Sequence, residues 1–118
     1  MNKRVYNEMV KDYSEVELTE EEFNKIINNS HDLVVVDFFA EWCMPCLMLS
    51  PIIEDLSEQM SEVKFVKINI DENENLASKF RVSSVPCLVI FKNGKEAGRI
   101  VGAHSSEVIE ERIVQHMN

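Results

Sequence analysis

The sequence predicts a single α/β domain in which helices cover both faces of a mixed β-sheet. Three observations lead to this prediction. Strand-like and helix-like segments alternate along the chain, residues 33–39 are nearly all apolar, and Asn93-Gly94 is a strong hairpin signal between two extended segments. Because strand–helix alternation requires right-handed crossovers, we expect a parallel core to which the final hairpin adds an antiparallel edge.

The first third of the chain alternates between the two kinds of element. Residues 14–18 alternate polar and apolar side chains, which is typical of a strand. Thr19 and Glu22 have the spacing of a capping box and are expected to open a helix. The strand at 33–39 follows and carries β-branched residues on both faces, as in strands buried inside a parallel sheet.

The rest of the chain continues the alternation. A helix is expected after residues 43–46, a strand at 63–70 and a short helix around residues 76–80. Strands at 86–92 and 95–101 flank the hairpin turn, and Ser105 is expected to cap a last helix. The predicted order is β-α-β-α-β-α-β-β-α. We expect residues 1–12 to form an N-terminal extension and residues 13–118 to form the domain.

Composition excludes several classes of protein. The 118 residues include 12 Lys and Arg against 21 Asp and Glu, which gives a formal net charge of −9. This balance argues against a nucleic-acid partner and against an anionic membrane surface. The longest apolar runs are too short to cross a bilayer, and the first residues lack the apolar stretch of a secretory signal. We therefore expect a cytoplasmic protein, and we also expect it to be a monomer.

The most informative feature is a pair of cysteines, Cys43 and Cys46, at a strand-to-helix junction. In a first helical turn, residues three apart are neighbours, with α-carbons about 5–6 Å apart, a separation that a disulfide bridges. Unpaired N–H groups and the helix dipole favour ionisation of the Cys43 thiol there. We expect Cys43 to be the attacking cysteine, and Cys46, one turn further in, to be more shielded and to resolve the intermediate.

Spacing alone leaves a metal site or an inert structural pair open. The chain has one Cys-x-x-Cys motif, not two, and its third cysteine, Cys87, shows no metal-ligand spacing. The histidines show none either. Redox chemistry is therefore favoured.

Residues 36–46, Val-Asp-Phe-Phe-Ala-Glu-Trp-Cys-Met-Pro-Cys, resemble the active-site segment of thioredoxins. Residues 67–71, 85–86, 91–94 and 101–103 resemble further segments of the family in the same order, so the resemblance covers about residues 13–117. It implies the thioredoxin fold and a thioredoxin-type electron carrier that reduces protein disulfides. The implied partners are a thioredoxin reductase, which in most lineages uses a flavin and NADPH, and disulfide-containing protein substrates. The chain has no Gly-rich dinucleotide fingerprint, so we expect no cofactor of its own.

The family resemblance also assigns a role to a carboxylate. Asp37 lies within the apolar strand 33–39, where burial disfavours its charged form. A structural pair of Asp37 with Lys67 is one interpretation. The resemblance implies instead that Asp37 exchanges a proton with Cys46, aided by Lys67.

Four further residues are implied to bind substrate. The resemblance predicts a cis Val85–Pro86 bond that presents the backbone of Val85 to a bound peptide. It places Trp42 beside the disulfide, although a half-buried packing role is the alternative. It places Gly102 at the same surface, where the lack of a side chain lets a partner backbone approach.

Three positions depart from the family pattern. Met44 replaces the usual Gly between the cysteines, which leaves the redox potential open. Leu47 replaces a basic residue and makes the rim more apolar, which leaves the partners open. Cys87 replaces a Thr; a buried, inert thiol is the simpler interpretation, and a third redox or metal-ligating sulfur is the alternative. The remaining rivals for the function are a disulfide oxidant or isomerase, a metal site at Cys43, Cys46 and Cys87, and a non-catalytic interaction module.

Overall fold

A computed structural model describes residues 19–29 and 33–117 of the chain. The described part forms, in order, α2 (Glu20–Asn28), β1 (Leu33–Phe39), α3 (Met44–Gln59), β2 (Val63–Asn69), α4 (Glu74–Lys79), β3 (Cys87–Lys92), β4 (Lys95–Val101) and α5 (Ser106–Val114). The expected extension at 1–12 and the expected strand at 14–18 lie outside it. No helix within it is long and apolar enough to span a membrane.

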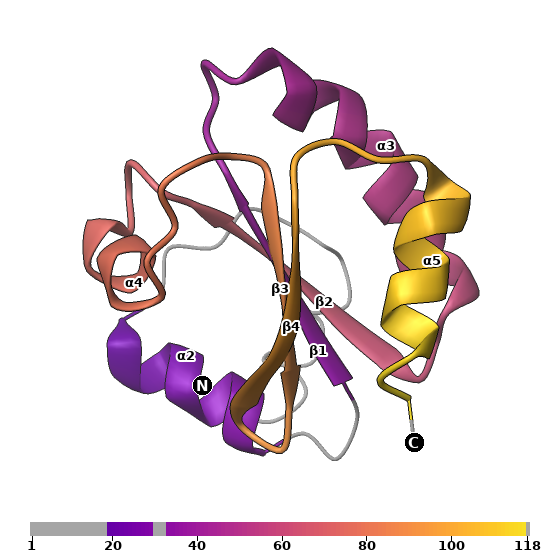
Figure 1. The fold of residues 1–118 in the computed structure, drawn as a ribbon. Helices are drawn as coiled ribbons and strands as arrows, with labels where there is room; N and C mark the ends of the chain where they lie inside the picture. Colours follow the sequence, from indigo (N-terminus) through magenta and orange to yellow (C-terminus); the bar gives the residue numbers. More distant parts are fainter. Residues whose placement is uncertain (1–18, 30–32, 118) are drawn as a thin grey trace.

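The sheet is mixed, with the strand order β2-β1-β3-β4, and the helices cover both of its faces (Figure 1). Helices α2 and α4 lie on one face, and α3 and α5 lie on the other. This arrangement confirms the predicted α/β class. The capping box of Thr19 and Glu22 is also present at the start of α2.

The expected parallel core is wrong in one respect. Among the described strands, only β1 and β2 are parallel, whereas β3 runs antiparallel to β1 as well as to β4. The reason is the size of α4, whose six residues span about 9 Å, while a strand of seven residues spans about 23 Å. Because so short a helix does not carry the chain back along the sheet, β3 starts near the end at which β2 finishes.

The hairpin between β3 and β4 turns at Asn93 and Gly94, as the sequence predicts. Both residues have positive φ, 53° and 81°, which is the requirement of the tight hairpin turn that Asn-Gly favours. A Cβ at position 94 would also overlap the side-chain oxygen of Asn28 in α2. The turn therefore fixes both the register of the hairpin and its contact with α2.

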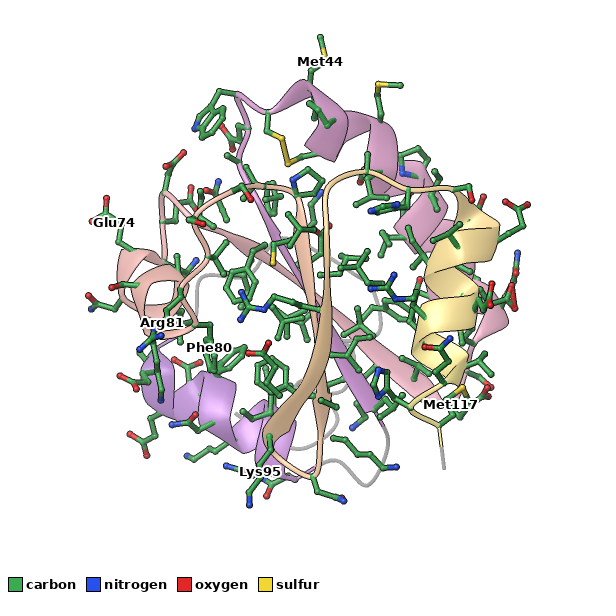
Figure 2. The ribbon with its side chains drawn as sticks, viewed as in Figure 1. Met44, Glu74, Phe80, Arg81, Lys95 and Met117 are labelled. Carbon is green, nitrogen blue, oxygen red and sulfur yellow. A yellow bond between two sulfur atoms is a disulfide. The ribbon has the colours of Figure 1, made fainter. Side chains whose placement is uncertain are left out.

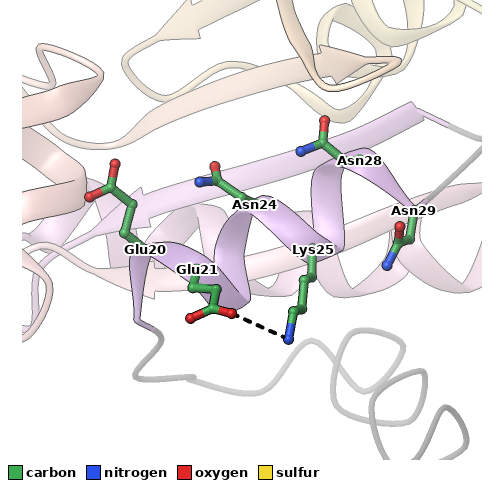
Figure 3. A pocket seen from close by; sticks show the side chains of 6 residues that line it. All are labelled: Glu20, Glu21, Asn24, Lys25, Asn28 and Asn29. Carbon is green, nitrogen blue, oxygen red and sulfur yellow. Dashed lines mark ion pairs between the residues drawn. The ribbon is translucent and has the colours of Figure 1, made fainter.

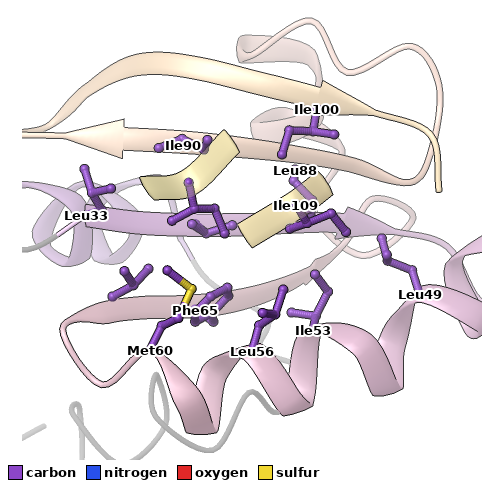
Figure 4. Close-up of a cluster of buried hydrophobic side chains, with 13 residues drawn as sticks. Leu33, Leu49, Ile53, Leu56, Met60, Phe65, Leu88, Ile90, Ile100 and Ile109 are labelled. Atoms are coloured by element: carbon purple, nitrogen blue, oxygen red, sulfur yellow. The ribbon is translucent and has the colours of Figure 1, made fainter. Parts of the chain in front are cut away.

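Two apolar clusters hold the layers together, one on each face of the sheet. The cluster under α2 and α4 contains aromatic rings in tilted and edge-to-face contact, among them Phe23, Phe80 and Phe91, with centroids 5.2–5.6 Å apart. The cluster under α3 and α5 is mainly aliphatic and includes Leu49, Ile53 and Leu56 (Figure 4). These clusters fix α3 against the sheet, and α3 begins beside the cysteine pair.

Candidate active site

Cys43 is the N-cap of α3, at the junction between β1 and the helix. Its backbone is extended (φ −93°, ψ 106°), and its Sγ accepts a hydrogen bond from the Cys46 N–H over 3.2 Å. Pro45 lies in the first turn, where its missing N–H would have had no helical partner. The sulfur therefore takes the place that a Ser or Asp oxygen has at many helix starts, where a negative charge is favoured.

Cys43 and Cys46 are joined by a disulfide, with α-carbons 5.3 Å apart. Both residues are 5% exposed and pack against Phe39 and Ala40. The expectation that Cys46 is more shielded than Cys43 is therefore wrong for this oxidised state. Val85, from a segment distant in the sequence, also packs against the pair.

A second backbone segment lies against the disulfide. The Val85–Pro86 bond is cis, as the resemblance implies, and the Val85 carbonyl oxygen lies 3.7 Å from Cys43 Sγ. The Gly102 N–H donates to the Pro86 carbonyl over 2.9 Å. Gly102 has a φ of +89°, a conformation that side chains rarely adopt, so glycine is required at this position. Segments 85–86 and 102 thus form one backbone surface next to Cys43.

Trp42 projects from the site and is 72% exposed, so the half-buried packing role is wrong. Its Nε1–H donates to the Asp71 carboxylate over 3.0 Å. Asp71 follows β2, 29 residues further along the chain. Sequence reasoning missed Asp71, because no local pattern relates a turn carboxylate to this indole.

Asp37 and Lys67 are neighbours under α3. They are register partners on β1 and β2, and Asp37 is 2% exposed. Lys67 Nζ lies 3.4 Å from the Ser50 hydroxyl of α3 and 4.6 Å from the centre of the Phe39 ring. The structure therefore brings both residues to the layer between the sheet and the helix that carries Cys46.

Cys87 is a free thiol, 2% exposed, at the start of β3. It packs in the cluster under α2 and α4, not in the cluster that holds the disulfide. Burial raises the pKa of the Cys87 thiol; Arg99 opposes this, while Glu96 and Asp37 add to it. A raised pKa keeps the thiol protonated, which fits the simpler interpretation of a buried, inert side chain.

The described residues contain no group of three or more His, Cys, Asp or Glu side chains that could hold a metal ion. Surface hollows also lie away from the cysteines. One follows α2 and carries the ion pair of Glu21 with Lys25, 3.7 Å apart (Figure 3). Another lies around the start of α4 and includes Asp71. Neither of these two hollows is lined by Cys43 or Cys46, whose disulfide is suited to thiol–disulfide exchange.

Comparison with known proteins agrees with this chemistry. The family model described as "Thioredoxin" matches residues 14–115. A thioredoxin of Chlamydia pneumoniae is 46% identical over 99 residues, which cover 84% of this chain and 95% of that protein. Thioredoxin-2 of Saccharomyces cerevisiae is 45% identical over 87 residues, covering 74% and 84% of the two chains.

Solved structures give the same result for the fold. A mutant thioredoxin from Halobacterium salinarum superposes with a TM-score of 0.83 at 33% identity, over 92% of this chain and 94% of that one. Fasciola hepatica thioredoxin superposes with a TM-score of 0.81 at 40% identity, over 87% and 99%.

Proposed function

Since this chain belongs to the thioredoxin family and is a thiol–disulfide oxidoreductase that reduces protein disulfides, we propose that Cys43 attacks and Cys46 resolves. The observation that carries this assignment is the Cys46 N–H aimed at Cys43 Sγ at the start of α3. That hydrogen bond and the helix dipole stabilise a thiolate at Cys43, and the thiolate is the nucleophile in disulfide exchange.

The proposed reaction has two exchange steps. The Cys43 thiolate attacks one sulfur of the substrate disulfide, which forms a mixed disulfide and releases the first substrate thiolate. Cys46 then loses its proton and attacks Cys43 Sγ, which releases the second substrate thiolate and leaves the Cys43–Cys46 disulfide. The substrate gains two electrons, and the dithiol of this chain loses two. Because Cys46 is tethered three residues away, its effective concentration is high.

Asp37 is the proposed proton acceptor for Cys46, with Lys67 as its partner. Both residues lie between the sheet and α3, and Asp37 is nearly fully buried. A buried carboxylate is a better base than an exposed one, because burial disfavours its charged form. The role is supported by this placement and by the family resemblance.

The proposed substrate-binding surface comprises Trp42, Val85, Pro86 and Gly102. Their support is the position of the Val85 carbonyl next to Cys43 and the hydrogen bond that joins Gly102 to Pro86. A substrate segment in extended conformation would add to this backbone as a short strand.

We also propose a setting for the reaction. The domain comprises residues 13–118 with an extension at 1–12, works as a monomer in the cytoplasm and is reduced by a thioredoxin reductase. A dithiol that must be regenerated fits a reducing compartment. The disulfide oxidant, the metal site and the interaction module are not favoured by the family match.

The test is an insulin-reduction assay with dithiothreitol, comparing the wild type with Cys43→Ser and Cys46→Ser. Wild-type turnover is expected to exceed that of dithiothreitol alone, and Cys43→Ser is expected to abolish it. In a separate incubation without dithiothreitol, pre-reduced Cys46→Ser is expected to accumulate a mixed disulfide with the substrate at Cys43, visible by mass spectrometry. Two results would overturn the assignment. One is wild-type turnover no faster than dithiothreitol alone, and the other is substrate trapped on Cys46 in Cys43→Ser with none trapped on Cys43 in Cys46→Ser.

A further inference from the structure

Exposed apolar side chains gather at the end of the molecule that carries the disulfide. Among the described residues, the large apolar side chains with the greatest exposure are Trp42 (72%), Met48 (70%), Met44 (67%) and Leu47 (55%). Met44 projects outward at the start of α3, with the disulfide beneath it (Figure 2). Exposed apolar groups that cluster, rather than scatter, mark a surface that contacts a partner.

Three of these residues form one face of a helix. Met44, Leu47 and Met48 are spaced i, i+3 and i+4 on α3, and we call them the α3 apolar surface. The opposite face of α3 buries Leu49 and Ile53 against the sheet. A helix usually presents one apolar face to its own core and a polar face to water, so a second apolar face needs another explanation.

The reaction itself places a partner on this surface. A mixed disulfide brings a substrate sulfur to about 2.05 Å from Cys43 Sγ, and Cys43 is only 5% exposed. Because α3 rises about 1.5 Å per residue, Met48 lies only about 7.5 Å along the axis from Cys43. Residues that flank the substrate cysteine therefore come within reach of the α3 apolar surface.

The charge of the whole chain gives a competing expectation. A net charge of −9 would favour basic partners. Charges are screened beyond about 8 Å at physiological salt, however, and the first turn of α3 has no acidic residue. Two acidic side chains lie near Trp42, the exposed Glu41 and Asp71, which accepts a hydrogen bond from the Trp42 indole. The α3 apolar surface itself carries no charge, so we expect local apolar contact to outweigh the overall charge, and flexible thioethers adapt to partners of different shape.

We propose that Met44, Leu47 and Met48 are specificity-determining residues that select protein disulfides whose cysteines are flanked by apolar side chains. This inference rests on the proposed function of Cys43, and it adds the class of substrate.

The test compares three peptide disulfides that are identical except for the residues next to each cysteine, which are Leu, Lys or Glu. Pre-reduced wild-type protein is mixed with each peptide, and the rate of peptide thiol release is measured at low and at high salt. The Leu peptide is expected to react about tenfold faster than both charged peptides, at either salt concentration. Preference for the Lys peptide that disappears at high salt would overturn the inference in favour of overall charge.

Uncharged variants then test whether the preference for the Leu peptide comes from the α3 apolar surface. The double variant Leu47→Gln with Met48→Gln keeps helix propensity and adds no charge near Cys43. Its preference for the Leu peptide is expected to fall to about twofold or less. The matched control is Val114→Gln, because Val114 is a 50% exposed apolar residue on α5 and is not part of the α3 apolar surface. The control is expected to keep the wild-type preference, and unfolding midpoints verify that each variant is folded.

The two proposals fail in different ways. If the wild type reduces neither the peptides nor the small disulfide dithiobis(nitrobenzoate), the proposed function is wrong. If it reduces all of them without regard to flanking residues, or if the double variant keeps the full preference, the inference about the α3 apolar surface is wrong and the reductase function stands.

Discussion

The backbone N–H of Cys46 donates a hydrogen bond to the sulfur of Cys43 over 3.2 Å. The two cysteines that form the disulfide are therefore also joined by a hydrogen bond at the start of α3, with the Cys46 N–H as donor and the Cys43 sulfur as acceptor. Because this contact comes from the backbone, it does not depend on the Cys46 side chain being free. It favours negative charge on Cys43 at the stage at which Cys43 leaves or attacks.

Asp37→Asn is expected to slow resolution of the mixed disulfide. The amide cannot accept a proton from Cys46, so the second exchange step should fall by on the order of 100-fold near neutral pH and recover only as rising pH ionises the Cys46 thiol directly. The measurement is the rate of substrate release from a pre-formed mixed disulfide across pH. Asp55→Asn, an exposed position on α3, serves as the control and is expected to match the wild type. An unchanged rate and pH profile in Asp37→Asn would remove Asp37 from the mechanism.

Cys87 is expected to make the folded state less stable at alkaline pH. The folded-state pKa is raised, chiefly by burial, so the thiol stays neutral in the fold at pH values at which the unfolded thiol ionises. The stability that the buried neutral thiol gives the fold is fully present below about pH 8.5, the ordinary pKa of a thiol in the unfolded chain. This stability is lost as pH rises through the folded-state pKa.

The check is urea unfolding of the oxidised protein at neutral pH and at about pH 10. The free energy of unfolding should fall more in the wild type than in Cys87→Ala, and Cys87→Ala should keep its reductase activity. Equal losses in the two proteins would show that Cys87 titrates normally in the fold.

Gly94→Ala is expected to destabilise the fold without changing the chemistry. The φ of +81° strains an alanine, and its Cβ would overlap Asn28, so the cost should be about 1–3 kcal/mol in the free energy of unfolding. Denaturant unfolding measures the effect. Asn93→Gly is the matched variant in the same turn, and it should cost little because glycine accepts the φ of 53°. Equal stability of Gly94→Ala and the wild type would contradict this description of the turn.

Much of the fold follows from local patterns in the sequence. The capping box at Thr19 and the turn at Asn93-Gly94 are each decided by residues within four positions, and the structure has both. The direction of β3 could not be obtained in this way. It depends on how far the short α4 carries the chain, and hydrophobic periodicity does not report that path.

The candidate site also has some features that follow from local sequence and others that do not. The position of Cys43 at the start of α3 follows from the Cys-x-x-Cys spacing after an apolar strand. The equal burial of Cys46 and Cys43 does not, because Val85, 42 residues from Cys43, covers the pair. The hydrogen bond from Trp42 to Asp71 likewise joins residues 29 positions apart. Contacts of this kind are set by packing of distant segments.

The proposed mechanism depends on the start of α3 making Cys43 an unusually acidic thiol. The most direct measurement is the rate of iodoacetamide alkylation of the reduced protein against pH, resolved by mass spectrometry into the peptides that carry Cys43, Cys46 and Cys87. Cys43 is expected to react with a pKa well below the ordinary value of about 8.5, and below that of Cys46. A Cys43 that titrates at the ordinary value, with Cys46 equally or more reactive, would contradict it.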